Sequence, residues 1–462
     1  MNQNPQNPLL PLGDFKPADQ WQTHINSIFY GMLGPGIHDH FQTYVSLDHR
    51  LAHALAEEYF QRVQAAPSPP STRFIQEWGV GNGNLAACFL TRLKQLDTNE
   101  RVYPFTHYVL CDYSQEILKG VRANPRLAEH AGHFSTVQVD ANQLNCFKPQ
   151  SIDKIISNEI WDDLATRVLL KHENTLYEEY LQPLLDPALL NIEFESFIKI
   201  FNEKDLSALQ SVPPFLAAIH WEKSYQRVDI SDWPHAETIQ AQMDLCAEEI
   251  PIPINTGACI TLERAHQLLR ADSQGYTAFD YGMHSLDELN QEGRPYCNLY
   301  GGQYTFMVNF DLLARIGKSI GFHQVKKEYQ HDYTGRWLNA KVASMVEILQ
   351  NHPQVTQMPP WDRDLLMVQT IHAVNSAYRS PYKNKMKYPP MEGTPKKQRK
   401  LMARLVDNLN ARGVPDTVAY VSQSEVVSAL KPLRKLGYRE KDLLRAFQSS
   451  PPTIAFTALH FR

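Results

Sequence analysis

The chain has 462 residues, a net charge of −5 and 43% hydrophobic residues, so it can bury a large core and is not disordered. This charge gives no reason to expect nucleic acid as a partner, because nucleic-acid-binding domains are usually basic. The six cysteines are spaced singly, which excludes a zinc ribbon and suits reduced thiols. No secretory signal and no apolar run of about 20 residues is present, so we expect a cytoplasmic protein without a membrane partner.

The first part of the chain, residues 1–70, is predicted to be an extended, proline-punctuated arm followed by helices, best patterned over Leu51–Val63. The second part, residues 71–165, alternates apolar strand patterns with amphipathic helices. The predicted strands are residues 73–78, His107–Asp112, Phe134–Asp140 and Asp153–Glu159, and the helices are Leu85–Leu96 and Ser114–Ala123. This alternation predicts βαβ units and a parallel sheet.

Residues 166–259 read as a long helical insertion rich in aromatic residues and proline, which we expect to form the substrate region. The alternation resumes over residues 260–340, with a helix at Ile260–Ala271, a strand at Gly275–Gly282, and strand, helix and strand between Thr305 and Tyr329. Residues 341–462 read as helical. The predicted fold is therefore α/β, a Rossmann-like sheet with helical N-terminal, inserted and C-terminal regions. The basic run Lys383–Arg404 is either a solvated loop or a surface for an acidic partner.

Three glycines, Gly79, Gly81 and Gly83, lie between a predicted strand and a predicted helix. Glycine lets the backbone approach a ligand closely, and the helix N-terminus adds unpaired N–H groups. The spacing is G-x-G-x-G, whereas dinucleotide-binding proteins have G-x-G-x-x-G with an acid about 20 residues further on. Here Asn84 takes the sixth position and Asp112 lies 29 residues after Gly83. The loop therefore departs from the dinucleotide pattern.

The pattern E-x-G-x-G-x-G that begins at Glu77 resembles motif I of class I S-adenosylmethionine-dependent methyltransferases. The resemblance implies S-adenosyl-L-methionine (SAM) as cofactor and S-adenosyl-L-homocysteine as product. In that superfamily an acid after the second strand binds the ribose, and one after the third strand approaches the adenine; Asp112 and Asp140 match them. The expected cofactor-binding residues are Glu77, Gly79, Gly81, Gly83, Asp112, Tyr113, Asp140, Ala141 and Asn158.

A narrower resemblance covers roughly residues 25–340. The segment Ser157–Leu164 is similar to the N-E-x-x-D-A-L stretch of the MidA-like family, which includes the mitochondrial complex I assembly methyltransferase. The segments GVGNGNLA, VLCDYSQEIL, AFDYG and the run from Tyr300 to Phe322 also resemble that family. Asp163 departs from it, because the family has Ala there. The resemblance implies a methyltransferase whose acceptor is a protein arginine.

Carboxylates suit such chemistry, because they attract a cationic acceptor and can take its proton. We predict Glu159 and Asp162 as the catalytic residues, with Asp163 as a third carboxylate nearby. In an alternative interpretation Asp162 and Asp163 cap a following helix. Trp161 is the best aromatic candidate for the acceptor pocket. His38 and His40 flank an acid in a loop, but we predict no metal site there.

Three functions remain open at this stage. The first is N-methylation of a guanidinium or amine, with protein arginine as the acceptor that the resemblance implies. The second is a methyltransferase for a small molecule or a peptide natural product, and the third is a non-catalytic SAM-binding assembly factor. The expected partner is a protein or small-molecule methyl acceptor, and the chain is a possible homodimer. Gly301 and Gly302 are expected to mark a further loop that approaches the same pocket.

Overall fold

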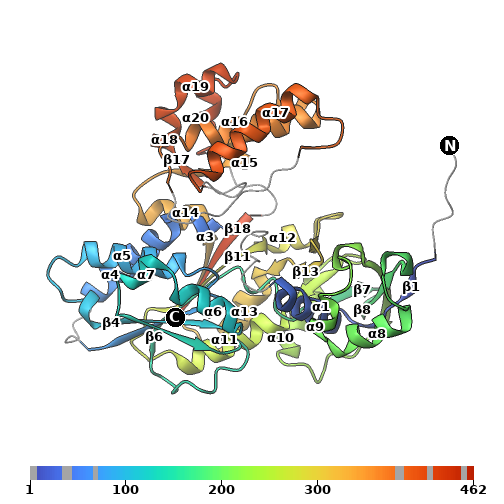
Figure 1. Ribbon diagram of the computed structural model, residues 1–462. Coiled ribbons are helices and arrows are strands. Elements are labelled where there is room, and N and C mark those ends of the chain that lie inside the picture. Colours follow the sequence, from blue (N-terminus) through green and yellow to red (C-terminus); the bar gives the residue numbers. More distant parts are fainter. Residues whose placement is uncertain (1–7, 34–43, 66–70, 380–389, 414–419, 449–454) are drawn as a thin grey trace.

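A computed structural model describes residues 8–33, 44–65, 71–379, 390–413, 420–448 and 455–462 (Figure 1). Its centre is a mostly parallel sheet in the order β15-β18-β11-β6-β3-β4-β5, with β14 paired to β11. The strands are β3 (Arg73–Trp78), β4 (Thr106–Asp112), β5 (Phe134–Gln138), β6 (Ile152–Asn158), β11 (Gly275–Met283), β14 (Val308–Asn309), β15 (Val325–Tyr329) and β18 (Ala455–Phe461). Only β18 runs antiparallel to its neighbours in this path. The predicted α/β fold with a Rossmann-like sheet is confirmed.

Helices follow the strands as the alternation predicted. They are α5 (Asn84–Leu96), α6 (Gln115–Arg122), α7 (Pro125–Ala128), α11 (Thr256–Leu268), α12 (Leu286–Leu289) and α13 (Phe310–Ile320). All seven residues of β6 are buried, as expected for a parallel strand covered on both faces. Because parallel strands end at the same edge of a sheet, the segments after β3, β4, β5 and β6 meet at one edge.

The N-terminal region contains the predicted helices, which are α1 (Ala18–Leu33), α3 (Tyr44–Leu47) and α4 (Arg50–Ala65). The arm before them forms the short strands β1 (Leu10–Pro11) and β2 (Lys16–Pro17), which pair with β8 of the insertion. Helix α4 packs against α5 on the central sheet. Helix α1 instead lies beside the insertion and β13, where it covers the edge at which β6 ends.

The prediction that the insertion is mostly helical is wrong. Much of it is an antiparallel sheet of β7 (Arg167–His172), β8 (Thr175–Leu185), β9 (His220–Arg227) and β10 (Ile252–Ile254), beside α8 (Phe194–Glu203), α9 (Leu206–Leu209) and α10 (Ala236–Leu245). The turn between β7 and β8 consists of Glu173 and Asn174, whose φ angles are 47° and 59°. Hairpin turns with two positive φ angles usually contain glycine, so this one left no obvious sequence signal. Pro183 within β8 further obscured the strand.

The C-terminal region is helical, as predicted, in most of its described part. It contains α14 (Gln330–Trp337), α15 (Met345–Gln350), α16 (Pro360–Val374), α17 (Lys396–Asn410), α18 (Gln423–Ser428), α19 (Leu430–Lys435) and α20 (Glu440–Arg445), with a small sheet of β16 (Val342–Ser344) and β17 (Tyr420–Ser422). The helices from α15 onward share their own hydrophobic cluster, whereas Tyr333 and Trp337 of α14 pack with the central sheet. The prediction missed β18, which returns from this region to the central sheet.

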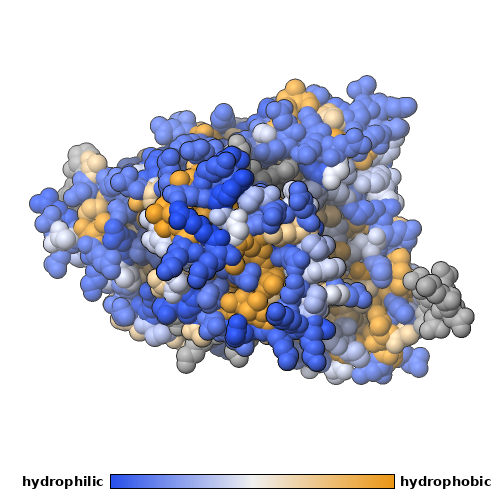
Figure 2. Space-filling view, turned by 90° about the horizontal axis from the view of Figure 1, so that it is seen from above, coloured by the Kyte–Doolittle hydropathy of each residue, from blue (hydrophilic) through white to orange (hydrophobic). Residues whose placement is uncertain are grey.

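Figure 2 looks down onto this end of the molecule and shows a mostly hydrophilic face with a few groups of apolar side chains. Five cations of the basic run lie exposed on α17: Lys396, Lys397, Arg399, Lys400 and Arg404. Lys383, Lys385 and Lys387 fall outside the described residues. No helix in the described part of the chain is long and apolar enough to span a bilayer.

Candidate active site

The glycine loop connects β3 to α5, and its backbone explains its composition. Gly79, Gly81 and Gly83 have φ angles of 73°, 50° and 75°, a region that residues with a side chain rarely adopt. A Cβ atom added at Gly79 would lie 2.3 Å from Cγ2 of Ile160, in the segment after β6. The loop is therefore held against that segment, and any side chain at Gly79 would push the two apart.

Two acids follow the neighbouring strands, as predicted. Asp112 ends β4, and its carboxylate accepts a hydrogen bond of 2.9 Å from the backbone N–H of Ser114. Burial raises the pKa of Asp112 to about 6, although backbone hydrogen bonds oppose this rise. Val139 donates its N–H to the backbone oxygen of Asp112 at 2.8 Å, which brings the exposed Asp140 and the adjoining Ala141 to the same edge.

Tyr113 and Glu77 occupy contrasting places. Tyr113 is half-exposed beside Asp112, and its ring makes an edge contact with Tyr30 of α1 at a centroid distance of 6.0 Å. Glu77 is buried on β3 and accepts a hydrogen bond of 2.8 Å from the hydroxyl of Tyr108. Burial raises the pKa of Glu77 to about 8. The contact that the structure gives Glu77 is thus within the sheet.

The residues that end β6 have an unusual geometry. Glu159 has a φ angle of 52°, which is uncommon for a residue with a side chain. Residues with such backbone conformations are often found at functional sites. Its backbone N–H is fixed by the carbonyl of Phe279 at 2.8 Å, and its carboxylate accepts a bond of 2.9 Å from Asn158. Burial raises the pKa of Glu159 to about 7. The other atom of the Asn158 amide, Oδ1, is buried without a hydrogen-bond partner among the described residues.

Three further carboxyl groups lie next to Glu159, and tyrosine and amide groups bind them. The hydroxyl of Tyr281 donates to Asp162 at 2.6 Å. Asp163 accepts bonds from Gln303 at 2.5 Å and from the hydroxyl of Tyr30. Asp280, on β11, is the carboxyl group that sequence reasoning missed, although it opens the DYG motif.

The four carboxyl groups of Glu159, Asp162, Asp163 and Asp280 form what we call the acid cluster. Asp280 accepts the backbone N–H of Trp161 at 2.8 Å and so joins β11 to the segment after β6. Burial raises the pKa of Asp163 to about 6 and those of Asp162 and Asp280 well above the ordinary range. The negative charge of Asp280 contributes to the rise at Asp162. A cation placed here would stabilise the ionised forms.

Two interpretations of this segment are wrong. Asp162 and Asp163 do not cap a helix, because residues 161–163 form a turn and a strand, β7, follows. Trp161 does not line an acceptor pocket. Its side chain is fully buried, donates 2.9 Å to the hydroxyl of Thr261, and makes an edge contact with Tyr276. The side chain of Trp161 is therefore part of the hydrophobic core.

Helix α1 supplies site residues that the sequence analysis did not identify. Gln22, Asn26 and Tyr30 are spaced by four residues, so they lie on one helix face. Gln22 donates to the backbone oxygen of Asp162 at 3.1 Å, and Asn26 donates to Asp163 at 3.3 Å. The four-residue spacing of these polar residues along the helix was the available signal.

The prediction of no metal site concerned His38 and His40, which lie outside the described residues. Within the described ranges, no group of three or more potential ligands could hold a metal ion. The acid cluster is built from buried carboxyl groups that hydroxyl and amide donors already occupy. Its chemistry is therefore that of binding a cation and exchanging protons.

The glycine loop, the strand-end acids and the acid cluster meet at one edge of an α/β sheet. Residues 54–326, more than half of the chain, match a family model described as "Putative S-adenosyl-L-methionine-dependent methyltransferase" (Methyltransf_28). The chain belongs to this family of SAM-dependent methyltransferases. The expected enzyme class, the SAM cofactor and the MidA-like resemblance are confirmed.

Two solved structures of one superfamily are similar to this chain. A COG1565 superfamily member from Burkholderia thailandensis bound to S-adenosyl-homocysteine is 16% identical, with a TM-score of 0.46 over 79% of this chain and 84% of that one. Another COG1565 protein from this organism is 13% identical, with a TM-score of 0.41 over 97% and 87% of the two chains. A search of the curated proteins finds no match.

Proposed function

We propose that this methyltransferase acts on a nitrogen atom of a cationic acceptor, either an amine or a guanidinium group. The observation that supports this proposal is the acid cluster beside the glycine loop. Burial has raised the pKa of each of its four carboxyl groups, so ionising them without a cation is costly. A cationic acceptor would recover that cost, whereas a neutral oxygen or carbon acceptor would not.

The residues at the edge fit the cofactor. The positive φ angles of the glycine loop suit a backbone that approaches a ligand closely, and Gly79 lets the loop pack against Ile160 of the segment after β6. The unpartnered Oδ1 of Asn158 provides a buried hydrogen-bond acceptor for the cofactor at the same edge. We assign SAM binding to Glu77, Gly79, Gly81, Gly83, Asp112, Tyr113, Asp140, Ala141 and Asn158. When bound, SAM supplies an electrophilic methyl group.

Glu159 is the proposed general base. With a pKa raised to about 7 it exists in both protonation states near neutral pH, which suits proton transfer. Methyl transfer forms a nitrogen–carbon bond, breaks the sulfur–carbon bond of the cofactor and releases one proton from nitrogen, which Glu159 takes. Asp162, whose pKa burial also raises and whose carboxyl group accepts a hydrogen bond from Tyr281, orients the acceptor. Both residues face the acceptor in this scheme.

Protein arginine is the acceptor that the MidA-like resemblance favours. The test is incubation of the protein with labelled SAM and whole lysate, followed by separation by size and identification of the labelled atom. Label on arginine or lysine nitrogen in protein supports the proposal, and label on a small amine supports the small-molecule alternative. Label on oxygen or carbon alone contradicts N-methylation.

A further inference from the structure

A short hairpin forms one wall of the acceptor site. It consists of β12 (Cys297–Tyr300) and β13 (Gln303–Phe306), which pair with each other and with no other strand in the described part of the chain. Gly301 and Gly302 make its turn, with φ angles of 60° and 104°. A Cβ atom at Gly302 would lie 2.3 Å from Cβ of Leu216, so the turn rests directly on the insertion. The hairpin is therefore fixed at its tip.

One edge of this hairpin is occupied. Tyr304 donates its backbone N–H to Oδ1 of Asn26 at 2.9 Å and accepts a bond from Nδ2 of the same residue at 2.9 Å. Phe306 donates its N–H to the backbone oxygen of Asp162 at 3.0 Å. Both residues of β13 thus direct their backbone groups away from β12, as non-hydrogen-bonded positions of an antiparallel pair do.

The strand register shows which backbone groups lie at the other edge of the hairpin, the outer edge of β12. Tyr304 is opposite Leu299, so the N–H and C=O of Leu299 also point outward, on the far side of β12. Among the residues that the structure describes, none bonds to these two groups. The side chains of Leu299 and Tyr300 are 53% and 45% exposed. An edge of this kind is a template for a further strand.

The two faces of the hairpin look at different surroundings. Tyr300 pairs with Gln303, which binds Asp163, so this face looks at the acid cluster. Burial raises the pKa of Tyr300, and the charges of Asp162 and Glu159 add to this rise, which agrees with the placement of Tyr300 near the acid cluster.

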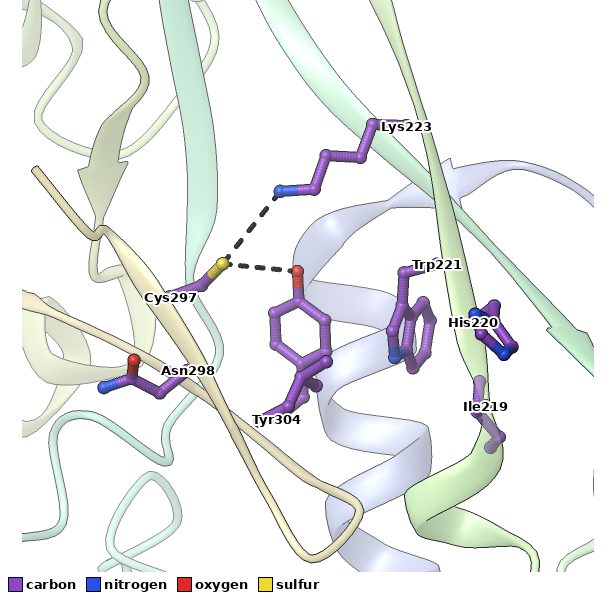
Figure 3. Close-up of a pocket in the computed structure, with 8 residues that line it drawn as sticks. Ile219, His220, Trp221, Lys223, Cys297, Asn298 and Tyr304 are labelled. Atoms are coloured by element: carbon purple, nitrogen blue, oxygen red, sulfur yellow. Dashed lines mark hydrogen bonds between the residues drawn. The ribbon is translucent and has the colours of Figure 1, made fainter. Parts of the chain in front are cut away.

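Leu299 and Tyr304 share the opposite face, which lines a groove of about 410 Å³ (Figure 3). Trp221 of β9 forms the far wall of this groove, and its ring meets that of Tyr304 at 5.0 Å. Lys223 also lines the groove, but its ammonium group lies 3.6 Å from the buried carboxylate of Glu179. Because this charge is already balanced, the groove suits an apolar side chain better than an anion.

We propose that the outer edge of β12 binds an extended segment of a polypeptide acceptor as an added strand. Successive side chains of a strand point to opposite faces. A cationic side chain beside Tyr300 would therefore reach the acid cluster, and the residue next to it in sequence would enter the groove beside Leu299. This inference rests on the proposed function and names its substrate class: a polypeptide in which an apolar residue adjoins the methylated arginine or lysine.

The test uses 11-residue peptides with a central arginine or lysine whose two neighbours are either leucine or alanine. N-acetyl-arginine amide and N-acetyl-lysine amide serve as minimal acceptors. We expect the full-length protein to methylate the leucine peptides with a kcat/KM at least about fivefold above that of the alanine peptides, because a filled groove removes apolar surface from water. Both peptides should exceed the minimal acceptors.

Two substitutions of Leu299 distinguish the contribution of its backbone N–H from that of its side chain. L299P removes the outward N–H, and the fold tolerates proline there because that N–H makes no ladder bond. It should lower kcat/KM for leucine and alanine peptides alike, by about fivefold or more. L299A keeps the N–H and should affect only the leucine peptides. Unchanged SAM binding and melting temperature verify the folding of both variants.

The outcomes are distinct. Wild-type rates for L299P on both peptides, or equal rates for leucine and alanine peptides, overturn the added strand while the proposed function stands. The same holds if the minimal acceptors are methylated as well as the peptides. If SAM binds but no amine or guanidinium compound is methylated, the proposed function fails and the added strand fails with it.

Discussion

The two halves of the site are built by different means. The cofactor half depends on backbone: three glycines with positive φ angles, a helix N-terminus and strand-end acids that follow one another in the chain. The acceptor half depends on side chains from four distant segments, namely α1, the turn after β6, β11 and β13. The cofactor half should therefore tolerate little change in backbone shape, whereas single side chains of the acceptor half can be substituted without moving the backbone.

The largest effect on cofactor binding should come from the backbone half. G79A places a Cβ atom 2.3 Å from Ile160 at a φ angle of 73°, so the loop must move. We expect SAM affinity, measured by calorimetry, to fall by about 100-fold or more, because a displaced glycine loop loses several contacts with the cofactor at once. The matched control is G293A, where φ is 72° but no atom lies within 4 Å. It should leave SAM affinity unchanged; an equal loss in both variants would refute the steric argument.

The next effect belongs to the acceptor half. E159Q keeps the shape of the side chain but removes the base, so kcat should fall by about 10²- to 10⁴-fold. SAM affinity should stay within about twofold, because the amide oxygen of the glutamine can still accept the hydrogen bond from Asn158. The exposed Glu292 provides the control, E292Q, which should retain full activity. Full activity in E159Q would show that Glu159 is not the base.

The pH dependence of activity tests the role of Glu159 in a second way. Because the pKa of Glu159 is raised to about 7, the carboxylate that accepts the proton is the minor form below that pH and the major form above it. Activity at saturating SAM should therefore rise with pH through about 7, and fall about tenfold for each unit below it. This limb should vanish in the residual activity of E159Q. A limb that persists unchanged there would assign the titration to another group.

The smallest effect is expected for a residue that acts through another. The hydroxyl of Tyr30 donates to Asp163 and lowers the pKa of its carboxyl group against the effect of burial. Y30F should make Asp163 harder to ionise and raise KM for the cationic acceptor by about three- to tenfold, with kcat little changed. The raised KM should recover toward the wild-type value at higher pH, whereas a purely structural defect would not recover.

Sequence reasoning succeeded where local pattern determines structure. The strands β3, β4, β5, β6 and β11 and the helices between them follow from apolar periodicity, and the glycine loop follows from its spacing. It failed for the insertion, because the β7–β8 turn has glutamate and asparagine at positive φ in place of glycine. It also failed for Trp161, whose burial is decided by β11, α11 and β18 and not by its neighbours in sequence.

The acceptor half lay beyond the sequence for a similar reason. Nothing near Asp163 in the chain indicates that Tyr30 and Gln303, more than 130 residues away on either side, hold its carboxyl group. Asp162 and Asp163 favour helix starts in general, and only the strand β7 directly after them excludes that reading here. Tertiary contacts, which no local pattern encodes, therefore decide which carboxylates meet.

The antiparallel strand β18 has a consequence for how the molecule is made. It lies between β11 and β15, both of which precede it in the chain by more than a hundred residues. On the ribosome these two strands emerge long before their shared neighbour β18, whose Phe461 packs on Tyr276 and Phe322. The catalytic sheet therefore closes only after synthesis of the whole helical region, so a nascent chain exposes two unpaired strand edges until that moment.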